Sequence, residues 1–256
     1  MVTSEAPNRR RRIALGCGLL IVLLVAGLWI MARSLAHELP EGSAGAEADA
    51  LAHEMMQAVD VDAWHATGAV AWDFGGRQQH LWDRERQLAR VRWAENEVLL
   101  DLDTRSGRAW TGGAEVTAEA DRDPLLEAAW AHWCNDSFWL NPVAKLFDEG
   151  VERRLVDVDG GRGLLVTYTS GGVTPGDAYL WLVGDDGVPT AWRMWTQILP
   201  VQGLEASWED WTRLDTGAMI AGRHRIAVID LELTDLRAAE TLDALGEGDA
   251  FAPIRP

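Results

Sequence analysis

Hydrophobic and polar positions alternate with two different periods along the chain, and the changes of period divide it into elements. Between residues 47 and 60 apolar side chains recur every three or four positions, which predicts one amphipathic helix. From residue 66 to 113 the period falls to two, which is typical of antiparallel strands with one buried face. We expect about four strands in this part, including a long one through residues 80–93.

A helical pattern interrupts the strands in the middle of the chain. Asp123 before Pro124 is typical of a helix start, because proline fits the first helical position. Asn141 and Pro142 repeat this signal for a second, short helix. The connector between the two helices combines turn-forming residues with phenylalanine and tryptophan, which is unusual for a segment exposed to solvent.

After residue 151 the period of two returns and predicts about six more strands, the last of them over residues 225–233. Asp-Gly pairs at 159–160 and 186–187 indicate hairpin turns. About ten antiparallel strands form a sheet too large to stay flat. The sequence therefore predicts a mainly antiparallel β (α+β) fold, a curved half-barrel covered by helices, with the apolar connector against its concave side.

The amino-terminal part of the chain differs from the rest in charge and hydropathy. Residues 1–12 contain four consecutive arginines, and residues 13–32 are twenty residues without a charge. Such a segment would be about 30 Å long as a helix, the thickness of a bilayer core. Preceding arginines favour an amino end in the cytoplasm. We expect a single-pass anchor in a bacterial inner membrane, or alternatively a signal peptide, followed by a flexible tether at 33–46.

Charge and motifs exclude several classes of function. Residues 34–256 contain 18 basic and 39 acidic side chains and so have a net charge of −21. This charge repels phosphate backbones and excludes nucleic-acid binding. Cys17 falls in the apolar run and Cys134 outside it, so we expect no disulfide. No spacing typical of a zinc site, a phosphate-binding loop or a nucleophile elbow occurs. We therefore predict no catalytic residue, no metal site and no cofactor.

The order of elements resembles the LolA/LolB-like lipoprotein carrier fold of bacterial envelopes. The stretch NDSFWLNPVAKLFDEGV at 135–151, followed by AYLWLV and ASWEDWTRL, is also similar to a poorly characterised family of exported bacterial proteins with that fold. The resemblance implies an incomplete barrel plugged by helices over an apolar cavity. The resemblance covers roughly residues 47–235. We expect the domain at 47–245 and a tail at 246–256, and the charge pattern predicts that both lie in the periplasm or outside the cell.

The chain contains 14 tryptophans, and these are the candidate ligand contacts. Tryptophan offers a large apolar surface with little rotamer freedom to lose. Two interpretations remain open: the rings fill the barrel, or they line a cavity for a lipid or lipoprotein acyl chain. The candidate cavity residues are Trp72, Trp82, Trp110, Phe138, Trp139, Phe147, Trp181, Trp192, Met194 and Trp208. Lys145, the only lysine, is the candidate contact for a lipid headgroup.

A row of arginines is the remaining candidate surface. Arg84, Arg86, Arg90 and Arg92 would share one side of the predicted long strand. They would pair with acidic side chains of neighbouring strands, or alternatively dock an acidic protein partner. We expect a membrane-tethered, non-enzymatic domain that binds an apolar ligand in lipid or lipoprotein hand-off. The alternatives are a ligand-free scaffold or sensor of an envelope complex, and an envelope hydrolase.

Overall fold

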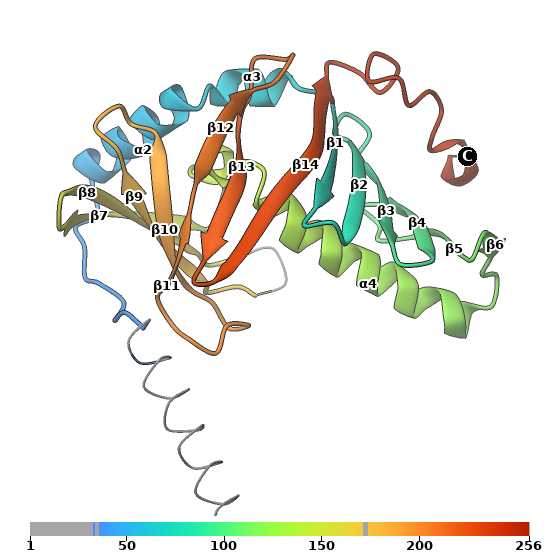
Figure 1. The fold of residues 1–256 in the computed structure, drawn as a ribbon, viewed down its shortest axis with the longest axis horizontal. Coiled ribbons are helices and arrows are strands. Elements are labelled where there is room, and N and C mark those ends of the chain that lie inside the picture. Colours follow the sequence, from blue (N-terminus) through green and yellow to red (C-terminus); the bar gives the residue numbers. More distant parts are fainter. Residues whose placement is uncertain (1–32, 34–35, 171–173, 256) are drawn as a thin grey trace, which may run out of the picture.

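The computed structural model describes residue 33, residues 36–170 and residues 174–255 (Figure 1). The basic segment at 1–12 and the predicted membrane anchor at 13–32 lie outside these residues. Among the helices of the described part, none is both long and apolar enough to cross a membrane.

An antiparallel sheet of 14 strands forms the body of the domain, bent so that β7 and β6 lie on opposite sides (Figure 1). The strand order is β6-β5-β4-β3-β2-β1-β14-β13-β11-β10-β9-β8-β7, and β12 pairs with β13 beside this path. The mainly antiparallel fold is thus confirmed, with more strands than the ten or so expected.

The strands fall into two runs along the chain. The first run is β1 (Ala69–Phe74), β2 (Gln78–Asp83), β3 (Leu88–Trp93), β4 (Asn96–Asp101), β5 (Gly107–Thr111) and β6 (Ala114–Glu115). The second run is β7 (Val151–Val158), β8 (Gly161–Tyr168), β9 (Ala178–Val183), β10 (Pro189–Trp195), β11 (Leu204–Ser207), β12 (Glu209–Arg213), β13 (Met219–Ile226) and β14 (Ile229–Ala239). Pairing of the last strand, β14, with the first, β1, joins the two runs into one sheet.

The helices cover one face of this sheet. Helix α2 (Ala46–Ala58) packs on β7 and β8, and α3 (Val61–Ala66) follows it. Helix α4 (Glu119–Phe138) crosses the strands β3 to β5 (Figure 1). The short helix η1 (Pro142–Lys145) lies in the connector, where Leu140, Val143 and Leu146 are all fully buried. The connector is apolar because it belongs to the core.

Helix α4 is longer than predicted at both ends. It begins at Glu119 rather than near Pro124, because the backbone amides of Asp121 and Arg122 bond to the carbonyl of Ala118 and form a first turn before the proline. It also runs through the residues 135–137 that resemble a chain break. Asp136 is compatible with the helix because its side chain bonds across to another element rather than to its own backbone.

Two predicted strands are hairpins instead. Residues 80–93 fold into β2 and β3, because the Asp83 carboxylate accepts from the Arg86 amide in a turn that brings Gln87 to a φ of 52°. The predicted strand at 225–233 contains the tip between β13 and β14, where Ala227 has a φ of 53°. The prediction of a single row of four arginines is therefore wrong, because Arg84 and Arg86 lie in the β2–β3 turn and Arg90 and Arg92 lie on β3.

The face opposite the helices is covered in part by the ends of the described chain. Leu242, Leu245 and Phe251 of the carboxy-terminal tail pack on the β1 to β4 region, and the tail ends in η2 (Ala252–Ile254). At the other end, Ser43 forms a backbone bridge with Leu155 of the outer strand β7. The segment predicted as a tether is thus held to the domain at two points, His37 and Ser43.

Candidate functional site

Four tryptophans meet in the interior between the sheet and the connector. Trp181 and Trp192 are cross-strand neighbours on β9 and β10, Trp208 lies between β11 and β12, and Trp139 comes from the connector. The ring centroids in contact lie between 4.8 and 6.0 Å apart, and none of the four residues is more than 8% exposed. The connector therefore closes the interior with an aromatic ring of its own, packed in the arrangements that aromatic pairs prefer.

The remaining candidates near this group extend it along the sheet. Phe138 contacts the ring of Trp192 at 5.7 Å, and Met194 is buried in the same cluster. Trp72 and Trp82 lie further along the same face, in the part covered by α3 and α4. The structure thus brings eight of the ten proposed cavity residues onto the face under the helices.

Two proposed cavity residues lie elsewhere. Trp110 is on the opposite face, against the cluster of the carboxy-terminal tail, because its neighbour Ala109 takes the inward position of β5. Phe147 is 39% exposed and its ring lies 4.1 Å from the Arg153 guanidinium. Lys145 is also exposed and pairs with Asp148 of the same short segment. Neither Trp110 nor Phe147 can therefore line the interior.

The interior contains polar atoms for which the described residues provide no hydrogen-bond partner. They are Nε1 of Trp72, Trp181, Trp192 and Trp208, the Tyr168 hydroxyl, the side-chain amide of Asn141, and Nε2 of His224. An unpaired buried group of this kind costs about 1–3 kcal/mol. The aromatic interior is thus apolar in area but rich in hydrogen-bond donors.

His224 is a buried basic group beside the four tryptophans. Its Nδ1 lies 3.0 Å from the carbonyl oxygen of Ser207, and since a carbonyl can only accept, Nδ1 carries the proton. Burial lowers the pKa of His224 to about 4, so the ring is neutral at neutral pH and Nε2 has a free lone pair. The rings of Trp139 and Trp208 contact it at 4.9 and 4.4 Å.

A buried histidine-aspartate pair lies between β2 and α4. His80 Nε2 is 2.7 Å from Asp136 Oδ2, and the His80 ring stacks on Trp72 at 4.5 Å. Asn135 donates to the other carboxylate oxygen at 2.8 Å. No hydrogen bond within the described chain brings a hydroxyl or thiol to His80 Nδ1, so the pair lacks the nucleophile of a catalytic triad.

Cys134 is the nearest thiol along the chain to this pair. Burial raises its pKa to about 11, which keeps it protonated and unreactive at neutral pH. In the part of the chain that the structure describes, no three His, Cys, Asp or Glu side chains gather as metal ligands.

The arginine row divides into two separate sites. Arg84 donates to the carbonyls of Trp64 and Thr67 and lies over the Trp64 ring at 4.3 Å. Burial lowers the pKa of Arg84 to about 10. Arg86 bonds to Asp83 through its Nε at 2.6 Å. Arg84 therefore holds the β2–β3 turn to α3, and Arg86 stabilises the turn itself.

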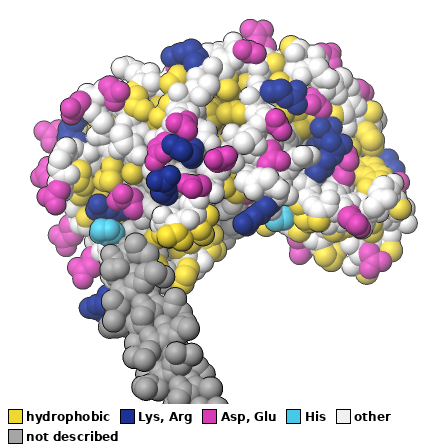
Figure 2. Space-filling view, in the orientation of Figure 1, with side chains coloured by type: hydrophobic (Ala, Val, Ile, Leu, Met, Phe, Trp, Pro, Cys, Tyr) yellow, Lys and Arg dark blue, Asp and Glu magenta, His cyan; other side chains and the backbone are white. Residues whose placement is uncertain are grey.

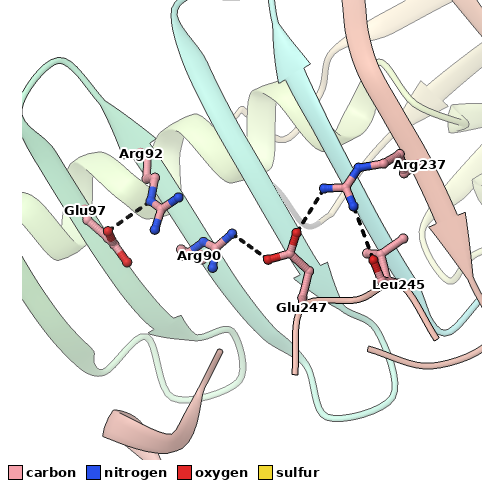
Figure 3. Close-up of polar contacts among 6 residues, drawn as sticks. All are labelled: Arg90, Arg92, Glu97, Arg237, Leu245 and Glu247. Carbon is pink, nitrogen blue, oxygen red and sulfur yellow. Dashed lines mark hydrogen bonds and ion pairs between the residues drawn. The ribbon is translucent and has the colours of Figure 1, made fainter. Parts of the chain in front are cut away.

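Arg90 and Arg92 line a polar cavity of about 500 Å³ on the face opposite the helices. Figure 3 shows that Glu247 of the carboxy-terminal tail bridges Arg90 at 3.0 Å and Arg237 at 2.9 Å, while Arg92 bonds to Glu97 at 2.9 Å. The hydrogen bonds from Arg237 and then Arg90 lower the pKa of Glu247. The arginines thus already hold carboxylates of their own chain, and an acidic partner would have to displace them.

Sequence reasoning missed the partners of both polar features, the arginine cavity on the outer face and the His80–Asp136 pair under the helices. The row of arginines was visible in the sequence, but its partner Glu247 lies 157 residues from Arg90. Asp136 lies 56 residues from His80, and the only signal was an acidic residue inside an apolar stretch. Periodicity gives the face of a side chain, whereas these pairs depend on how distant strands and helices meet.

The fold and this interior define a protein built on one large antiparallel sheet with buried aromatic rings under its helices. Comparison with family models and with curated proteins gives no match for the sequence. Among solved structures, the chain is similar to a DUF1329 family protein from Desulfovibrio piger ATCC 29098, at 10% identity and a TM-score of 0.37. The match covers 75% of this chain and 92% of that chain. So distant a likeness says nothing about the ligand or the activity.

Proposed function

We propose that this chain is a membrane-tethered extracytoplasmic domain with a LolA/LolB-like half-barrel that receives an acyl chain of a lipid or lipoprotein in its aromatic interior. The observation that carries the proposal is the set of buried donors without partners among the interior tryptophans. An acyl group brings a carbonyl acceptor for an indole N–H together with an apolar chain for the rings. Such a ligand would offset the cost of about 1–3 kcal/mol for each donor that it pairs.

The connector is the part that would move to admit a ligand. The interior rings pack on one another, so an acyl chain needs Trp139 and its neighbours to shift outward. The connector would shift as one unit, because the short helix η1 holds its backbone together between α4 and β7. The aromatic residues on β9 and β10 would stay in place, since cross-strand pairing fixes them.

Energetics favour a receiving role over extraction. Burial of each methylene gains about 0.8 kcal/mol relative to water, and eight of them about 6 kcal/mol. A bilayer interior already gives the same gain, so burial in the aromatic interior of this domain cannot by itself draw a lipid out of a membrane. A tethered domain would therefore hold an acyl chain that another component delivers, and pass it onward without a chemical reaction.

A ligand-free scaffold or sensor of an envelope complex is the second candidate. The packing of Trp139, Trp181, Trp192 and Trp208 at low exposure favours it, because filled interiors need no ligand for stability.

Photo-crosslinking separates the two candidates. The full chain would be placed in vesicles that contain a trace of diazirine-labelled fatty acid, irradiated, digested and mapped by mass spectrometry. We expect labelled peptides around Trp139, Trp192 and Trp208, unchanged in a Phe147→Ala variant whose altered side chain faces solvent. Label confined to residues 13–32 would show that the interior takes no acyl chain, and the scaffold function would stand.

A further inference from the structure

Exposed hydrophobic side chains gather at one end of the domain. Among the described residues five large hydrophobic side chains are exposed, and all but Phe147 lie at this end. They are Leu39 (52% exposed), Ile198 (65%), Val228 (95%) and Ile229 (61%). Figure 2 shows hydrophobic side chains at the lower edge of the view, below the strands β10 to β13 of Figure 1. Four such residues at one end of an acidic domain indicate a contact surface.

Backbone pairing brings these residues together from three segments. Ala206 of β11 pairs with Ile226, the last residue of β13, so the hairpin tip at 227–228 lies beside the start of β11. The loop that carries Ile198 leads directly into β11, and its Gln202 carbonyl accepts from the His37 amide at 3.0 Å. Trp195 donates to the His37 carbonyl at 3.0 Å, which holds the segment with Leu39 beside the loop.

The attachment of His37 limits the distance between this end and the apolar run at 13–32. Four residues separate Ala32 from His37, and a fully extended chain covers at most about 18 Å over the five steps from one to the other. If residues 13–32 span a bilayer, His37 therefore lies within that distance of the end of the anchor, and the loop with Ile198 is bonded to His37 through Gln202. The apolar side chains at this end then have a bilayer as their nearest apolar surroundings.

The charged side chains nearest the hairpin tip are paired with one another, so they do not oppose this contact. Arg225 pairs with Asp230 at 2.9 Å on either side of the tip, and Arg223 pairs with Glu209 at 2.8 Å and with Asp210 at 3.2 Å. The domain as a whole is strongly acidic, so anionic headgroups would not attract it. The contact must therefore come from apolar insertion, for which a two-residue tip with an almost fully exposed valine is suited.

We propose that this end of the domain, formed by Leu39, Ile198, Val228 and Ile229, inserts into the interface of the bilayer that holds its own anchor. The inference rests on the tethering in the proposed function, but not on ligand binding. It fixes the orientation of the domain: β10, β11 and the β13–β14 hairpin stand with this end on the membrane, and the β9–β10 turn points away from it.

Site-specific fluorescence tests this orientation in the full chain. In a Cys17→Ser and Cys134→Ser background, an environment-sensitive dye is attached at Val228→Cys or at Asp185→Cys. Asp185 is a matched control, because it is exposed and lies in the β9–β10 turn. The length of β10, about 23 Å, separates this turn from the loop that carries Ile198. The chains are reconstituted in phosphatidylcholine vesicles, and quenching by iodide and by lipids spin-labelled near the headgroup is measured.

We expect the dye at residue 228 to be shielded from iodide and quenched by the spin-labelled lipid, with the opposite result at residue 185. A Val228→Asp and Ile229→Asp variant, labelled at Ile198→Cys, should lose the lipid contact while interior crosslinking persists. Equal iodide quenching at 228 and 185 would overturn the inference. Shielding that grows with the protein-to-lipid ratio would also overturn it, since a second copy would then cover the surface.

Carbonate extraction of the same vesicles reports the tether separately. A chain that stays bound, with residue 228 open to iodide, overturns the orientation alone. A chain that carbonate releases overturns the tether and the orientation together, while interior crosslinking still reports ligand binding.

Discussion

Replacement of Leu146 by alanine tests whether the connector after α4 belongs to the core. Leu146 is fully buried one residue beyond η1, in the same cluster as Trp139, Val143 and Leu51 of α2. Its amide bonds to the Val143 carbonyl at 3.3 Å, so the backbone there is fixed by the short helix. The truncated side chain would leave a cavity between α2 and the sheet that this local structure cannot easily close.

The expected loss follows from the burial of Leu146. Leucine-to-alanine changes at fully buried sites cost about 2.7–5.0 kcal/mol, depending on how far the site collapses. We expect about 3–4 kcal/mol here, because helices and strands hold both sides of the site. For a domain of this size each kcal/mol lowers the melting temperature by about 2–4 °C, so the variant should melt about 6–16 °C lower.

Phe147→Ala is the matched control one residue further along. The Phe147 ring is partly exposed and contacts the His53 ring at 4.4 Å and the Arg153 guanidinium at 4.1 Å. An exposed cation–π contact contributes about 0.5–1 kcal/mol, so this variant should lose about 1 kcal/mol. Both chains would be unfolded by urea in the same mild detergent and followed by tryptophan fluorescence. Equal losses for the two variants would refute a buried connector.

Three further results are expected. Asp136→Ala should cost about 1–3 kcal/mol in urea unfolding, because it leaves His80 Nε2 without a partner; no loss would contradict the buried pair. Glu247→Gln should lower the free energy of unfolding by about 1.5 kcal/mol. Because the pKa of Glu247 is lowered in the folded state, this loss should be complete above pH ~4.3 and shrink below it, and melting curves at several pH values would show this. Because the pKa of His224 is lowered to about 4 in the folded state, the unfolded chain takes up this proton at a higher pH than the folded chain. Stability should therefore fall as the pH drops from ~6.5 toward 4. His224→Gln should flatten this slope, and an unchanged slope would contradict a neutral buried His224.

The period of the hydrophobic pattern predicted the secondary structure where local preference and burial agree. The helix over 46–58 and most strands were identifiable because one face of each is buried. The hairpins at 84–87 and 227–228 were not, because their turns contain no glycine, proline or asparagine. Gln87 and Ala227 adopt positive φ values, which the pairing of the flanking strands imposes on them.

The candidate site was predictable only as far as strand alternation determines it. Trp181 and Trp192 could be assigned to one face from their strands, and the structure places them there. Phe147 could not, because a short helix followed by a turn gives no clear period. The pairing of Glu247 with Arg90 depends on a tail that returns across the sheet, and no local pattern encodes such a return.

The backbone bridge between Ser43 and Leu155 links attachment to protection from aggregation. β7 is an outer strand, and outer strands offer unpaired amides and carbonyls to other chains. Ser43 and Leu155 exchange two hydrogen bonds, at 2.9 and 2.8 Å, and so occupy part of that edge. If the chain is tethered to a membrane as proposed, proteolysis just after Ser43 would release the domain and remove the residue that covers this part of the β7 edge in the same cut. The fragment that begins at residue 44 should therefore form β-sheet aggregates more readily than the intact chain.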